Sequence, residues 1–279
     1  ISTAGDFHAL EVPVEELPGS NPQGLVFEPQ NASARGEWVV WREGSAGEKG
    51  AMPTLEADDW RIMAWNRETG SAFEVESAFN LHGDRFGPPA TWDVAPSTDG
   101  KDVYFEAMSP RDGEWDSTVF ATPLREPGAT RVVGVGASPV VGGEEVYWVE
   151  GGRRVVGEGG ALFEVGGDDW EIGRIASSDE LLVATVTSAQ GAWILVWDFE
   201  AGAATEAIDT GSTWAEASVW GRGFAWGNAS AASEAMMFHR GEDGVKKLWA
   251  TPGLSAPLLL GSTLAVPAEG ADGGISWHL

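Results

Sequence analysis

The chain has 279 residues, 43% of them hydrophobic, and its 17 basic and 43 acidic side chains give a formal net charge of −26. Binding to nucleic acid or to an anionic membrane surface requires clustered Lys and Arg, so we expect neither partner. The absence of cysteine excludes disulfides, thiolate metal sites and a cysteine nucleophile. No apolar run approaches the roughly 18 residues of a membrane-spanning helix, and no membrane-spanning segment is expected.

The chain begins at Ile1 and contains no apolar signal-peptide core. We interpret it as a mature or trimmed form from which a signal or anchor was removed. That interpretation predicts a secreted, periplasmic or cell-surface tethered protein. The abundance of Ala, Gly, Val and Trp beside few Lys favours a GC-rich bacterial source.

Short alternating or apolar segments, separated by Gly, Asp, Pro and Ser, recur along the whole chain. No stretch of ten or more residues carries the apolar stripe of a helix. In chain order the predicted strands are 24–30, 37–43, 60–66 and 72–77; 90–96, 102–108, 117–123 and 130–136; 137–143, 145–150, 161–165 and 169–173; 173–179, 181–187, 192–198 and 205–209; 214–221, 223–229, 235–240 and 246–251; and 256–261, 263–269 and 275–279.

These strands form six units, and four strands at a period of about 40 residues are typical of a propeller blade. We therefore predict an all-β fold, a six-bladed β-propeller of four-stranded antiparallel blades, as a single domain over residues 1–279 and a monomer. The sixth unit has three strands, and we expect the N-terminal strand, about residues 7–12, to complete it and close the ring. Closure would leave no open edge between the first and last blades. A pair of β-sandwiches is the alternative fold.

Residues 95–107 carry the clearest motif, Ala-Pro-Ser-Thr-Asp-Gly-Lys-Asp-Val-Tyr-Phe-Glu-Ala. The segment resembles the Ser-Pro-Asp-Gly-Lys-x-Ile-Ala-Phe repeat of TolB-like propellers, with Thr98 in place of the usual proline. We expect Asp99 and Gly100 to form the turn between the first and second strands of the second unit. Residues 177–186, with Ser178 and Asp179, are the nearest second copy. The resemblance implies a periplasmic or secreted six-bladed propeller that serves as a protein-binding scaffold.

Motifs for catalysis are missing from the sequence. No G-x-S-x-G, H-E-x-x-H or EF-hand loop occurs. We expect no cofactor, and the acidic pair Asp58 and Asp59 is only a weak candidate for calcium. The alternative to a binding scaffold is a hydrolase or lyase that acts on a sugar or lactone in the central channel. It would need Asp, Glu, Arg or His side chains converging from several inner strands. A third alternative is a structural module without a ligand.

In a four-stranded up-and-down blade, the loop between the second and third strands and the loop to the next blade emerge on the same side. We therefore expect four loops to lie on one face of consecutive blades: 44–59, 78–89, 109–116 and 151–160. Binding residues gather on such loops, and aromatic and Arg side chains are frequent hot spots. Tolerated insertion is the alternative explanation. We predict that this face binds a protein, peptide or glycan through His82, Asp84, Arg85, Phe86, Arg111, Trp115, Arg153 and Arg154.

Overall fold

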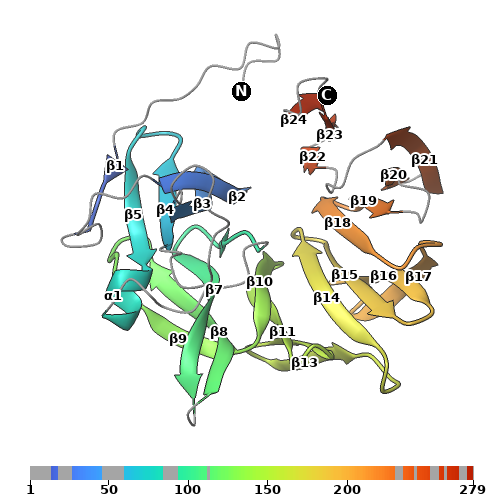
Figure 1. Cartoon of the computed structure of the whole chain (residues 1–279), viewed down its shortest axis with the longest axis horizontal. Coiled ribbons are helices and arrows are strands. Elements are labelled where there is room, and N and C mark those ends of the chain that lie inside the picture. The colour runs from blue at the N-terminus through green and yellow to red at the C-terminus, as the bar shows by residue number, and fades with distance from the viewer. Residues whose placement is uncertain are drawn as a thin grey trace. The chain divides into compact units, whose positions relative to one another are not determined.

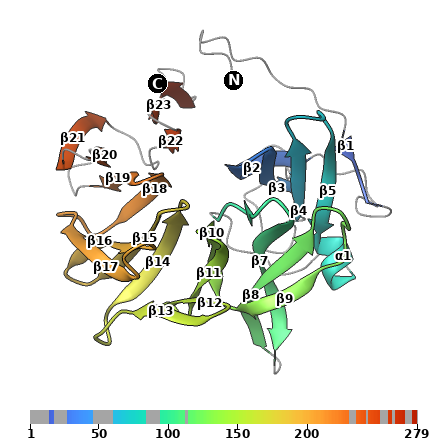
Figure 2. The same ribbon diagram turned by 180° about the vertical axis from the view of Figure 1, so that it is seen from behind.

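The computed structural model describes residues 14–17, 27–45, 60–83, 94–111, 114–229, 235–241, 244–251, 258–260, 263–269 and 275–278. Contacts between residues group the chain into two compact units, 1–134 and 135–279. Both units are built from sheets whose strands follow one another in the sequence (Figures 1 and 2). The prediction of a single domain stays a prediction.

The first unit contains two sheets. In one, the strands β2 (Phe27–Arg35), β3 (Trp38–Ser45), β4 (Trp60–Asn66) and β5 (Ala72–Ser77) are antiparallel neighbours, and β1 (Val14–Glu15) pairs with β5 in parallel. A short helix, α1 (Ala78–His82), follows β5. The other sheet has the order β6 (Ser97–Thr98), β7 (Asp102–Arg111), β8 (Glu114–Pro123) and β9 (Arg131–Val135).

The second unit holds four sheets within its described residues. Three have four strands each: β10 (Ala137–Gly142), β11 (Glu145–Glu150), β12 (Arg154–Gly157) and β13 (Gly160–Glu164); β14 (Glu171–Ser177), β15 (Leu181–Ser188), β16 (Gly191–Asp198) and β17 (Ala203–Asp209); and β18 (Ala215–Trp220), β19 (Gly223–Ala229), β20 (Ala235–Gly241) and β21 (Gly244–Thr251). A three-stranded sheet follows, with β22 (Leu258–Leu260), β23 (Thr263–Glu269) and β24 (Ile275–His278).

Most of the predicted strands are confirmed, and the third predicted unit is the largest error. Its third strand is β12, in a segment predicted as a loop, because Val155 and Val156 suffice for a short buried strand between two glycine-rich turns. The segment predicted as its third strand is therefore its fourth, β13. Residues 171–173, which overlap its predicted fourth strand, instead begin β14 of the next sheet.

Three further differences concern the first unit. The first strand of the second sheet is Ser97–Thr98, whereas 94–96 of the predicted strand are irregular. The predicted loop at 78 begins with a helix. Residues 7–12, expected to close the ring, lie outside the described residues, while Val14 and Glu15 pair with Ala72 and Phe73 as an additional strand of the first sheet.

One backbone hydrogen bond recurs in three of the sheets and marks the repeat unit. The N–H after the third strand donates to the carbonyl just before the second strand, and this bond joins Arg67 to Glu37, Leu124 to Lys101 and Phe199 to Glu180, at 2.8, 2.8 and 3.0 Å. In each of these sheets the bond links the turn before the second strand to the turn after the third strand. Because the bond uses only main-chain atoms, it persists where the sequence motif does not.

A second repeat lies in the turns after β4 and β16. Asn66 and Asp198 each follow a tryptophan, and each stands four residues before a glycine with positive φ, Gly70 at 73° and Gly202 at 61°. Each side chain accepts hydrogen bonds at its Oδ1 from the backbone N–H groups two and three residues ahead, both at 3.0 Å for Asn66 and at 2.9 and 3.1 Å for Asp198. The pattern Trp-Asn/Asp-x-x-x-Gly is therefore a repeated turn.

The Asp198 turn gives the first testable prediction. The N–H of Ala201 and the nearby guanidinium of Arg222 hold the pKa of Asp198 below its usual value. A carboxyl with a lowered folded-state pKa contributes stability above about pH 4, which is lost as the pH falls through the folded pKa. We expect Asp198→Asn to keep the turn, as Asn66 does, and to lose this contribution. Urea unfolding should show the two proteins converging between pH 7 and pH 2, and a pH-independent gap would contradict the assignment.

The predicted turn at Asp99 and Gly100 is confirmed. The Oδ1 atom of Asp99 accepts the N–H groups of Lys101 and Asp102 at 2.7 and 2.8 Å, and Gly100 has a φ of 89°. The turn between β14 and β15 is built in the same way, with a hydroxyl in place of the carboxylate. The Ser178 hydroxyl accepts the N–H groups of Glu180 and Leu181 at 3.2 and 3.0 Å. The turn at Ser178 therefore has the same hydrogen bonds although its sequence lacks Asp-Gly-Lys.

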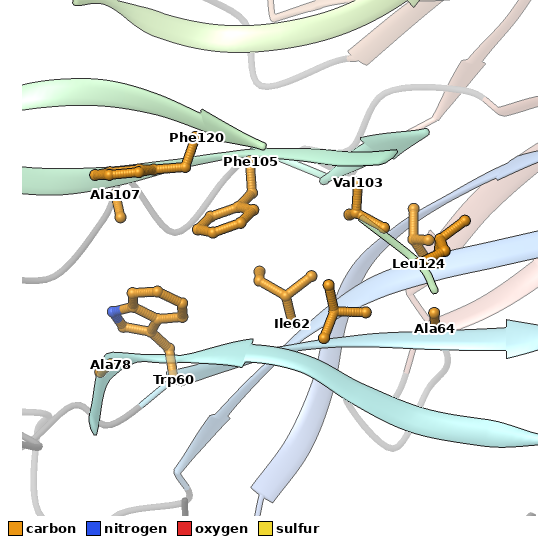
Figure 3. Close-up of a cluster of buried hydrophobic side chains, with 11 residues drawn as sticks. Trp60, Ile62, Ala64, Ala78, Val103, Phe105, Ala107, Phe120 and Leu124 are labelled. Carbon is orange, nitrogen blue, oxygen red and sulfur yellow. The ribbon is translucent and has the colours of Figure 1, made fainter. Parts of the chain in front are cut away.

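The core of the first unit lies between its two sheets (Figure 3). Trp60 and Ile62 of β4 face Val103 and Phe105 of β7. The Phe105 ring lies 5.9 Å from that of Trp60 and 5.7 Å from that of Phe120, and its side chain is fully buried. The apolar residues that follow the Asp-Gly turn, Val103 and Phe105, thus pack between these two sheets.

Candidate functional site

The candidate site of the first unit is built on α1 and on the hairpin of β7 and β8. Ser77 begins the helix, since its hydroxyl accepts the N–H of Asn80 at 3.3 Å. Gly83 ends it in the left-handed region, with a φ of 74°. His82 is therefore the last residue of a capped helical turn and not, as predicted, a loop residue.

The hairpin of β7 and β8 extends further than the sequence predicted. Its ladder continues without a register shift to Arg111 opposite Glu114, so most of the predicted loop 109–116 is strand. Pro110 lies opposite Trp115 and Met108 opposite Ser117, which places Met108, Pro110 and Trp115 on one face of the hairpin. The end of the hairpin thus carries an apolar face, and Arg111 and Glu114 lie on the opposite face.

Trp115 and His82 meet at this place. Their ring centroids are 6.0 Å apart and their planes stand at 86°, an edge-to-face arrangement. The Trp115 side chain is nevertheless 47% exposed, whereas His82 is half-buried. An aromatic ring that is held from one side and open on another can bind an apolar or sugar surface without first being ordered. The pairing needs both the helix and the extended hairpin, and the sequence revealed neither.

A buried glutamate, Glu76, lies just before the helix in the sequence and bonds to its first turn. Glu76 is the next-to-last residue of β5, directly before the cap residue Ser77, and is 1% exposed. It accepts the N–H of Ser77 at 3.0 Å and the hydroxyl of Thr130. The Asn80 side chain also bonds to it. Burial raises the pKa of Glu76 above its usual value, and these hydrogen bonds oppose the rise. Sequence reasoning missed this residue, because nothing in an alternating strand marks one glutamate as buried.

A buried arginine connects the two sheets of the first unit through a hydrogen bond. Arg42 of β3 is 1% exposed and donates from a guanidinium nitrogen to the carbonyl oxygen of Glu106 at 2.7 Å. Its guanidinium also stands 5.8 Å from the centre of the Trp60 ring. Burial lowers the pKa of Arg42 to about 10, and the negative charge of Glu106 opposes the fall, so the guanidinium is charged at neutral pH. Arg42 therefore brings a positive charge and a donor into an otherwise apolar contact.

The remaining predicted site residues divide into three groups. Arg111 lies at the exposed end of the hairpin that carries Trp115. Asp84, Arg85, Phe86, Asp58 and Asp59 lie outside the described residues. Arg153 and Arg154 belong to the second unit.

Of the two arginines of the second unit, only Arg153 lies in a connection between strands, as predicted, and Arg154 lies in a strand. Arg153 lies in the tight turn between β11 and β12 and donates to the carbonyl of Gly167. Arg154 is the first residue of β12 and binds the carboxylate of Glu150 on the neighbouring strand. Both guanidinium groups are thus engaged with nearby groups of the second unit.

The first strands of two successive sheets of the second unit bring charged groups together. Arg174 of β14 and Glu216 of β18 form an ion pair, with side chains 33% and 23% exposed. Within the described ranges, no group of three His, Asp or Glu side chains is arranged to hold a metal ion. The single described helix, α1, is far too short to cross a membrane.

No family model matches the chain, and no curated protein matches its sequence. Solved structures do resemble it. Acylaminoacyl peptidase of Pyrococcus horikoshii is 12% identical with a TM-score of 0.49, and the match covers 90% of this chain and 50% of that one. For prolyl oligopeptidase B of Galerina marginata the identity is 15%, the TM-score 0.48 and the coverage 86% and 36%. The β-propeller domain of the Trilobed protease of Pyrococcus furiosus is 9% identical with a TM-score of 0.37, and the match covers 90% of this chain and 80% of that one.

The chain therefore spans about half the length of the acylaminoacyl peptidase and 36% of the prolyl oligopeptidase. It is an all-β protein with several four-stranded antiparallel sheets, and its likenesses are to structures that include a named β-propeller domain. At these identities the likenesses carry nothing about activity.

Proposed function

We propose that the chain is a six-bladed β-propeller of the TolB-like kind that acts as an exported or surface-tethered, monomeric binding scaffold. The six groups of consecutive strands and the repeated turns support the fold, and the Asp99 turn supports the family. Residues 7–12 would complete the sixth blade. Because the chain has no cysteine, paired cysteines placed at 7–12 and along β24 would test closure, and a scan without any disulfide would count against it.

The binding surface in this proposal is centred on Trp115 and His82, and its partner is a protein, a peptide or a glycan. One observation carries it: Trp115 remains 47% exposed although the edge of an aromatic neighbour fixes its position. A half-exposed tryptophan that already packs against a neighbouring ring is a typical interaction hot spot, because little side-chain entropy is lost when it binds. Arg111 and Glu114 at the tip of the hairpin would supply polar contacts, and Asp84, Arg85 and Phe86 would extend the same surface.

A capture experiment tests this surface. The immobilised chain would be exposed to secreted and cell-envelope extracts and to an array of neutral glycans. We expect Trp115→Ala to lose at least nine-tenths of the captured partner, since removing a hot-spot tryptophan costs about 2 kcal/mol or more. Trp220→Ala is the matched control, because Trp220 is 55% exposed and is the last residue of β18 in the second unit. Equal capture by all three proteins would argue against the Trp115 surface.

One observation favours the alternative of a hydrolase or lyase in the central channel. Arg174 and Glu216 come from two successive inner strands, as a channel site would require. Chromogenic glycosides and lactones would be the substrates to try. Turnover that disappears in Glu216→Gln and persists in Trp115→Ala would replace the scaffold proposal with this one.

A further inference from the structure

Two separate elements must be placed correctly for His82 to reach Trp115. The helix α1 carries His82 at its end, and β8 carries Trp115 at its start. Neither element covers the other with a long apolar face, because α1 has only five residues and the hairpin end is largely exposed. The spacing of the two rings therefore depends on how the start of α1 is fixed to the rest of the unit.

Glu76 makes that connection. Its carboxylate accepts the backbone N–H of Ser77, the residue that caps α1, and a bond from the side chain of Asn80 within α1. It also accepts the hydroxyl of Thr130, which lies after β8. Thr130 is in turn 2.5 Å from the hydroxyl of Thr122 on β8. Since the Thr130 proton points to the carboxylate, Thr122 donates to Thr130, and a chain of hydroxyls runs from β8 to the start of the helix.

The backbone strengthens the same junction. The N–H of Gly128 donates to the carbonyl of Val75 at 3.0 Å, so the segment after β8 lies directly on the end of β5. The carboxylate receives donors from both sides of this junction, and as an anion it can accept all of them. An amide in its place would present its own N–H groups to some of these donors and would lose those bonds.

We infer that Glu76 is the positioning residue of the candidate surface: it holds α1 against β8 and thereby sets the pairing of His82 with Trp115. This inference rests on the proposed binding role of that pair. It assigns Glu76 no contact with a partner. Loss of the carboxylate should therefore change the geometry of the surface before any partner is added.

The imidazole signals of His82 report that geometry. The chain has four histidines, so their ring resonances can be resolved, and the His82 signal is assigned as the one that disappears in His82→Gln. An indole in edge-to-face contact displaces the resonances of its neighbour through its ring current, so Trp115→Ala should move the His82 signal. Spectra taken at pH 8 avoid the titration of ordinary imidazole, whose pKa is about 6.5.

We expect Glu76→Gln to move the His82 signal at least halfway to its position in Trp115→Ala. Glu74→Gln is the matched control, because Glu74 is an equally buried glutamate on the same strand that lies near Arg61. It should leave the His82 signal in place. A wild-type signal in Glu76→Gln, or an equal displacement in both variants, would overturn the assignment.

If Glu76→Gln does not fold, Thr130→Val removes a single donor and should produce a smaller displacement in the same direction. An unmoved signal in folded Thr130→Val would then overturn the role of the hydroxyl chain. Because the measurement uses no partner, its failure would leave the proposed binding function untouched, and failure of partner capture would leave the positioning role standing.

Discussion

Replacing Phe105 by alanine is expected to lower the free energy of unfolding by about 3–5 kcal/mol. The ring is fully buried between the two sheets of the first unit and stacks on Phe120 while Trp60 lies against it at 5.9 Å. Removing it takes apolar surface away and leaves a cavity that two hydrogen-bonded sheets cannot close. Denaturant unfolding followed by tryptophan fluorescence measures the loss.

Val132→Ala is the control for Phe105→Ala. Val132 is on β9 of the same sheet and is 60% exposed, so its truncation should change stability by about 0.5 kcal/mol or less. A loss of less than about 1 kcal/mol in Phe105→Ala would mean that the two sheets do not share this core.

Arg42→Ala is expected to cost about 3–5 kcal/mol, because it breaks a buried charged contact and leaves one partner behind. The carbonyl of Glu106 would lose the donor at 2.7 Å, and the Glu106 carboxylate, 1% exposed, would lose a compensating positive charge. The Arg42→Met variant fills the same space without the charge. It should be less destabilised than Arg42→Ala and still well below the wild type.

A double-mutant cycle separates the charge from the packing. Glu106→Gln in the Arg42→Met background should cost less than Glu106→Gln alone, because the removed charge has then already lost its partner. Arg131→Ala is the surface control, since its ion pair with Asp102 at 3.0 Å joins two partly exposed side chains and should be worth under about 1 kcal/mol. Fully additive losses would show that Arg42 is not coupled to the charge of the Glu106 carboxylate.

The sheets were predictable where strands are long and their turns are rich in Asp, Gly and Pro. The fourth predicted unit, β14 to β17, has all its boundaries within two residues of those predicted. Prediction failed where a strand is short. The segment Arg154–Gly157 has two charged neighbours and four glycines around it, and its pairing with β11 decides its structure more than its own sequence does.

The site was predictable only in part. The topological argument placed the segments 78–89 and 109–116 on one face, and His82 and Trp115 of these segments are in contact. The helix α1 was missed although Ser77 and Gly83 mark its two ends, because five residues cannot show a helical period. Glu76 could not be found from sequence, since its role arises from Thr130, more than fifty residues away.

The most direct test of the account is the dissociation constant of the captured protein, peptide or glycan, measured by surface plasmon resonance on three immobilised chains. The account predicts at least tenfold weaker binding to Trp115→Ala than to the wild type, and unchanged binding to Trp220→Ala. Equal dissociation constants for the wild type and Trp115→Ala, with binding intact, would contradict the claim that the surface around His82 and Trp115 is where this chain recognises its partner.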